Sequence, residues 1–127
     1  MKMKPQYLEN GKALKGFDPL SVYDGKATMG DENITSSYQN ATYQFKSSEN
    51  KKAFDKTPEK FAPKYGGHCS IAMSEGSLVP SNPHSSLIQD GALHVFYKDE
   101  EEDTQDEWNE NSIENKNQAE IEWRKLI

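Results

Sequence analysis

The chain has 127 residues, enough for one small domain, and only 33% of them are hydrophobic, which is low for a globular protein. Its formal net charge is −6, and the excess of acidic residues lies after residue 98, while residues 1–98 are nearly neutral. This distribution excludes a basic nucleic-acid-binding surface and predicts that the acidic run is a solvated linker.

The single cysteine, Cys69, excludes an intramolecular disulfide and leaves the redox compartment open. No apolar run approaches about 18 residues, so the sequence predicts a soluble chain without a membrane span. Residues 1–4 carry positive charge, but polar residues follow them in place of the apolar stretch of a signal peptide. The localisation stays open between a cytosolic chain and an exported, periplasmic one whose signal has been removed.

Local patterns in the first half predict a short hairpin followed by a helix. Residues 1–15 are polar without a sustained period and form an N-terminal segment ahead of the body. In residues 34–45 the apolar side chains alternate on either side of Gln39-Asn40, which is typical of a β-hairpin. Ser47 or Ser48 can cap a helix, and the helix after them presents Phe54 to the core.

The second half shows the same kinds of signal. Short helical pieces are expected at residues 59–61 and 69–75, a turn at residues 81–84, and a second hairpin in residues 87–97 around an Asp-Gly turn. Beyond the acidic linker, widely spaced apolar residues predict a C-terminal helix that docks on the body: Trp108, Ile113, Ala119, Trp123 and Leu126. No internal repeat is apparent.

These patterns predict an α+β fold in one small domain, with short antiparallel hairpins packed against short helices and a C-terminal helix docked after an acidic linker. The expected division is a polar N-terminal segment (1–15), the α+β body (16–98), and the acidic linker with its helix (99–127).

Several segments resemble the YHS domain family in its longer, single-cysteine form: GFDPLSVYDGKATMG, YQNATYQF, SSENKKAFDKTPEKFAPKYGGHCSIAMSEG and DGALHVFYKD, followed by a late tryptophan. The resemblance covers about residues 16–123. It implies a small α+β domain and association with a metal ion, because YHS domains occur beside heavy-metal transport ATPases and in some metal-dependent monooxygenase components. Members of the longer form are often exported. The short form has further cysteines near the hairpin, which this chain lacks.

The residues whose side chains could bind a metal ion or react are concentrated between Pro58 and Gly76. Tyr65 leads into a Gly66-Gly67 pair, and glycines permit a left-handed backbone, so these three residues form a structural turn. The turn leads to Cys69 at the start of a short helix. Free N–H groups and the helix dipole favour a thiolate at such a position.

A thiolate from Cys69, the imidazole of His68 and the thioether of Met73 on the same helical face would suit a soft metal ion. Copper is favoured, and zinc and iron remain open. Asp18 would be a further ligand if its carboxylate faced this turn. Because two or three ligands leave a site incomplete, a second chain or a small-molecule thiol would have to complete it. The protein is expected to be a monomer or a weak dimer.

Each candidate also has a structural interpretation. Cys69 and Met73 are then core side chains, His68 is a polar residue at a helix start, and Asp18 binds nearby backbone N–H groups. The leading hypothesis is a non-enzymatic binding module that handles a metal ion through the His68–Cys69 turn. The alternative is a structural or protein-interaction domain without a metal, and a redox thiol at Cys69 is a third possibility. No phosphate loop, dinucleotide fingerprint, Ser-His-Asp signature or HExxH motif is present.

Overall fold

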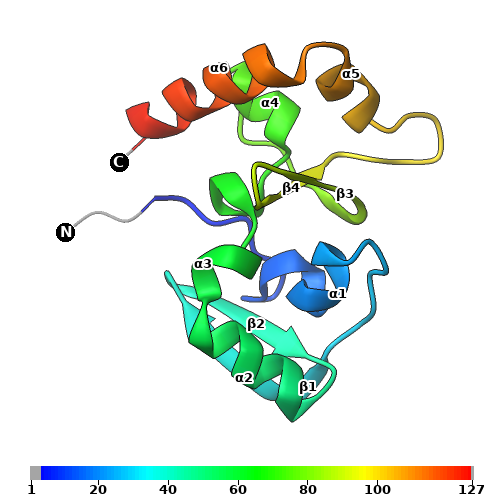
Figure 1. Ribbon diagram of the computed structural model, residues 1–127, viewed down its shortest axis with the longest axis vertical. Coiled ribbons are helices and arrows are strands. Elements are labelled where there is room, and N and C mark those ends of the chain that lie inside the picture. Colours follow the sequence, from blue (N-terminus) through cyan, green and yellow to red (C-terminus); the bar gives the residue numbers. More distant parts are fainter. Residues whose placement is uncertain (1–3, 127) are drawn as a thin grey trace.

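Two consecutive β-hairpins, each with its own helices, make up the molecule (Figure 1). The computed structural model describes residues 4–126. In the first hairpin β1 (Asp31–Tyr38) pairs antiparallel with β2 (Ala41–Phe45), and in the second β3 (Asn82–Gln89) pairs with β4 (Ala92–Phe96). The two hairpins are separate sheets. Both predicted hairpins are confirmed, although β3 begins earlier than expected, within the segment predicted as a turn.

Short helices flank both hairpins, as an α+β fold requires. Tight turns η1 (Ala13–Gly16) and η2 (Lys64–Gly67) lead into α1 (Pro19–Tyr23) and α4 (Ser70–Ser74), while α2 (Ser48–Lys56) and α3 (Pro58–Phe61) follow the first hairpin. The Ser47 hydroxyl accepts the Asn50 N–H at 3.1 Å, as its cap position predicts. The C-terminal segment docks as predicted, but as two helices, α5 (Gln105–Glu110) and α6 (Ser112–Lys125). Of its predicted anchors, Ile113 is wrong, because its side chain is exposed.

The two halves share one plan, so the expectation of no internal repeat is wrong. The elements η1, α1, β1 and β2 recur as η2, α4, β3 and β4, with every bound offset by 51 residues. Both hairpins shift register at the same place, between Asp31 and Thr35 and between Asn82 and Ser86. The repeat escapes sequence inspection because few equivalent residues are identical across these elements: Gly16/Gly67, Gly25/Gly76, Ala41/Ala92 and Phe45/Phe96.

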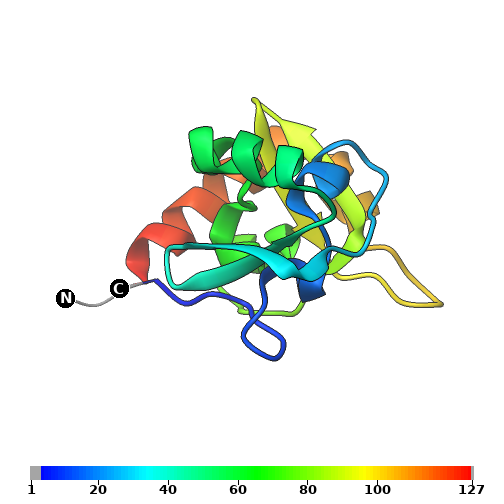
Figure 2. The same cartoon turned by 90° about the horizontal axis from the view of Figure 1, so that it is seen from below.

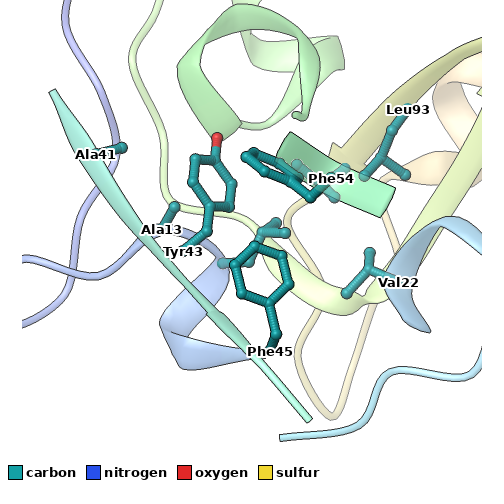
Figure 3. Packing of buried hydrophobic residues seen from close by; sticks show 9 residues of the cluster. Ala13, Val22, Ala41, Tyr43, Phe45, Phe54 and Leu93 are labelled. Atoms are coloured by element: carbon teal, nitrogen blue, oxygen red, sulfur yellow. The ribbon is translucent and has the colours of Figure 1, made fainter. Parts of the chain in front are cut away.

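Each half contributes a cluster of buried side chains. In the first, Tyr43 and Phe45 of β2 pack on Phe54 of α2 (Figure 3). Their ring centroids lie 4.8 and 5.2 Å, respectively, from that of Phe54. Leu93 and Val95 of β4 also belong to this cluster. The second cluster is formed by β4, η2, α4, α5 and α6: Tyr65, Cys69, Ile71, Met73, Phe96, Trp108 and Ala119. Strand β4 thus serves both clusters, which explains its nearly continuous apolar sequence.

The first and last described segments meet against the turn that joins the halves. The Tyr7 N–H donates to the Gly66 carbonyl at 2.8 Å. The Lys4 ammonium donates to the carbonyl of Trp123 at 2.8 Å and to that of Leu126. Figure 2 shows the chain from residue 4 onward beginning beside the end of α6. Within residues 4–126, no helix has both the length and the apolar character needed to cross a membrane.

Candidate functional site

The turn η2, which leads to His68 and Cys69, has an unusual backbone path. Tyr65, Gly66 and Gly67 are all left-handed, with φ of 60°, 64° and 80°. A β carbon on Gly66 would lie 2.3 Å from the carbonyl oxygen of Pro5, so the N-terminal segment can cross here only over a glycine. Sequence reasoning anticipated the glycines, whereas the left-handed Tyr65 carries no sequence signal.

Cys69 is the N-cap residue of α4, and its side chain is enclosed by the second cluster with 1% exposure. Its sulfur lies 3.5 Å from the hydroxyl oxygen of Thr104. The sulfur makes no cap hydrogen bond to α4, and the Cys69 N–H donates to the Val79 carbonyl at 2.9 Å. The thiol is therefore packed inside the domain and is not presented to solvent.

His68 is nearly buried, with its Nδ1 2.8 Å from the Tyr65 carbonyl oxygen. A carbonyl only accepts, so Nδ1 carries the proton and Nε2 is the nitrogen that could bind a metal. Burial lowers the pKa of His68, although its hydrogen bond to Tyr65 opposes this effect. The rings of Tyr7 and Trp123 lie 6.0 and 6.5 Å from the imidazole between ring centroids. His68 is consequently a neutral imidazole at physiological pH.

Met73 and Asp18, the other proposed ligands, lie in different halves. Met73 is 1% exposed in the cluster that contains Cys69, and its N–H donates to the Cys69 carbonyl at 3.0 Å. The fully buried Asp18 caps α1 in the first half, and its carboxylate accepts from the N–H groups of Leu20, Ser21 and Lys46 and from the Asn50 amide. The structure brings Cys69 and Met73 into one cluster and uses Asp18 to hold the other half together. In residues 4–126, no three His, Cys, Asp or Glu side chains gather as a metal-binding group.

The repeat makes Asp18 and Cys69 equivalent positions. Each follows a left-handed turn and is the N-cap residue of a five-residue helix. Asp18 fulfils this role with a carboxylate that binds helix N–H groups, whereas Cys69 fills it with a buried thiol. The two positions are therefore equivalent in backbone and differ in side-chain chemistry.

Sequence reasoning missed a buried pair, Ser70 and His94. The Ser70 hydroxyl oxygen and His94 Nδ1 lie 2.9 Å apart and share a hydrogen bond, and both residues are fully buried. The imidazole lies between Tyr65 and Trp108, with centroids 5.5 and 5.0 Å away, and its Nε2 has no hydrogen-bond partner among residues 4–126. No substrate can reach a pair enclosed in this way, so it is not a catalytic Ser-His arrangement.

Comparisons with known proteins return no relative: no family model, curated protein or solved structure matches the chain.

Proposed function

We propose that the protein is a non-enzymatic, YHS-like binding module in which the His68–Cys69 turn belongs to the framework and the ligand or partner binds elsewhere. The observation that carries this proposal is the equivalence of Cys69 and Asp18 in the internal repeat. Because Asp18 is a structural cap, the simplest role for its counterpart is also structural. The resemblance to the YHS family rests on the sequence motifs of residues 16–123.

Burial supports the same role for Cys69. A thiol with 1% exposure in an apolar cluster behaves as a small hydrophobic side chain. Met73, Phe96 and Trp108, which belong to the same cluster, are themselves buried. The framework role therefore requires no rearrangement of the core.

A second candidate function is binding of Cu(I) by Cys69, His68 and Met73. It is favoured by one specific observation: the Cys69 sulfur, unlike the Asp18 carboxylate, makes no cap hydrogen bond, and a second sulfur ligand, Met73, belongs to the same cluster. Thiolate and thioether sulfur select Cu(I), whereas a closed zinc site needs four ligands. Asp18 has no part in this site, because its carboxylate is committed to N–H groups of the other half.

Competition titration against a Cu(I) chelator separates the two functions. The framework proposal expects that the wild type, purified without an affinity tag, contains no stoichiometric metal and takes no copper from the chelator. It also expects Cys69→Ala to lower the free energy of unfolding by about 1–2 kcal/mol, since a buried side chain is truncated.

Metal binding would appear as about one equivalent of Cu(I) per chain or per dimer that Cys69→Ser abolishes and His68→Ala weakens without unfolding the domain. That result would replace the framework proposal with the second candidate. Asp18→Asn serves as a control, because a change at the equivalent cap should leave copper uptake unaltered.

A further inference from the structure

A small pocket opens where the two halves meet, and aromatic rings from both halves line it. Its volume is about 230 Å³. Tyr38 and Tyr43 of the first hairpin contribute to one side, and Tyr65 of η2 and Trp123 of α6 contribute to the other. Pockets at the junction of two structural units, apolar with a few polar groups, are where proteins commonly bind small molecules.

The rings that line the pocket are held in place by the two cores. Tyr38 and Tyr43 both pack on Phe54, with centroids 6.0 and 4.8 Å from its ring. Tyr65 and Trp123 meet each other edge to face, with centroids 6.1 Å apart and planes inclined by 65°. Because packing already fixes these side chains, a ligand would bind without the entropy cost of ordering them.

Tyr43 supplies the polar group. Its side chain is 2% exposed, and its hydroxyl has no hydrogen-bond partner within residues 4–126, although the residue lines the pocket. Figure 3 shows the oxygen at the edge of the cluster, pointing away from Phe45 and Val22. Burial raises the pKa of Tyr43, so the phenol stays neutral and can both donate and accept. The oxygen is not one of the fully enclosed atoms that lack a partner, so it stays accessible from the pocket, where a ligand with one polar group can bind it.

The charges around the pocket favour a neutral ligand. The Lys64 ammonium lies 2.9 Å from a Glu120 carboxylate oxygen, so its charge is compensated. The Lys4 ammonium already lies over the Trp123 ring, 5.4 Å from the centroid, and would repel a second cation at that ring. An anion would instead meet Glu59, which also lines the pocket. The pocket therefore does not stabilise a charged ligand of either sign.

We infer that this pocket binds a small neutral aromatic molecule that carries one hydrogen-bonding group, recognised by the Tyr43 hydroxyl. The volume agrees with this class of ligand, since a dry cavity of about 150 Å³ is enough to hold benzene. The inference goes beyond the proposed function: it does not involve Cys69, and either can fail without the other.

Phenol and toluene test the inference, because they have similar size and differ in the polar group. Titration followed by amide chemical shifts should show saturable phenol binding that moves the Tyr38 and Gly66 signals. Toluene should bind about fivefold more weakly, the usual value of one hydrogen bond. Tyr43→Phe should abolish this difference by weakening phenol alone, and Tyr38→Leu should weaken both ligands.

Tyr43→Phe is expected to fold, because it loses only a hydroxyl without a partner, and an unchanged or raised melting temperature verifies this. Tyr97→Phe is the matched control, since the Tyr97 hydroxyl donates to Asp99 away from the pocket and its removal should not affect either ligand. The inference is overturned if phenol fails to saturate, if phenol still binds more tightly than toluene to Tyr43→Phe, or if choline binds more tightly than phenol, which would indicate a cation cage.

Discussion

His94 shows how a single buried side chain can set the pH dependence of stability. Burial, the main cause, lowers its pKa from 6.5 to about 4; Lys64 and Lys116 lower it further, while Glu120 and Asp90 oppose them. Above pH 6.5 the imidazole is neutral in both the folded and the unfolded chain. Between pH 6.5 and about 4 only the unfolded chain takes up the proton, so the folded state loses stability as the pH falls.

We therefore predict that the free energy of unfolding falls by about 3 kcal/mol between pH 7 and pH 4 through His94 alone. The variant His94→Gln keeps a polar side chain that can bind Ser70 but removes the titration. Urea unfolding at a series of pH values should give a shallower decline for this variant, with the remaining slope partly due to His68, whose pKa is also lowered. Parallel curves for the two proteins would contradict the prediction.

The residues of the candidate site illustrate what local sequence can and cannot reveal. The position of Cys69 at a helix start follows from the glycines before it and the apolar residues after it, and the structure has this arrangement. The equivalence of Cys69 with Asp18 depends on aligned backbones in two halves, and their side chains have nothing in common. The contact between Ser70 and His94 is likewise long-range, and no spacing in the sequence encodes it.

At the scale of elements, the sequence correctly predicts the helices and strands that are marked by turn or cap residues next to them. Gln39-Asn40 and Ser47 mark a hairpin turn and a helix start, and both are found there. Strand β3 begins within a predicted turn because it pairs on one side only, which tolerates Pro83. The break between α5 and α6 at Asn111, with φ of −147°, has no glycine or proline to announce it.

The C-terminal helices are integral to the fold, although an acidic linker precedes them. Trp108 of α5 and Ala119 of α6 are fully buried in the second cluster. Deleting residues 106–127 should therefore lower the free energy of unfolding by at least about 3–5 kcal/mol, the typical cost of removing one buried tryptophan. Thermal or urea unfolding of the truncated chain measures the loss.

Ile113→Ala is the matched control within the same segment, because Ile113 is 73% exposed and should change stability by no more than about 0.5 kcal/mol. A truncated chain that melts at the wild-type temperature would mean that the two helices do not contribute to the cooperative unit.

At the scale of the whole molecule, the N-terminal segment, η2 and α6 meet at Gly66, and there is no room for a side chain at this position. A β carbon there would lie 2.3 Å from the Pro5 carbonyl oxygen and 3.1 Å from Trp123 Cη2. Gly66→Ala should therefore displace the N-terminal segment and cost at least about 2 kcal/mol more than a left-handed alanine alone. Hydrogen exchange of the Tyr7 amide, which donates to the Gly66 carbonyl, should accelerate.

Gly25→Ala isolates the backbone contribution, because Gly25 has a similar φ of 78° and no atom within 4 Å of the added carbon. Equal losses of stability for the two variants would show that the N-terminal segment adjusts without cost.

The passage of the N-terminal segment over Gly66 also affects the order in which the segments reach their native contacts during synthesis. Residues 4–7 leave the ribosome before any other described segment, yet their partners are Gly66, Trp123 and Leu126. The first hairpin and α2 can bury Tyr43, Phe45 and Phe54 as soon as they emerge. Residues 4–7 have to wait until α6 has been synthesised, so the earliest of these segments to be made is among the last to reach its native contacts.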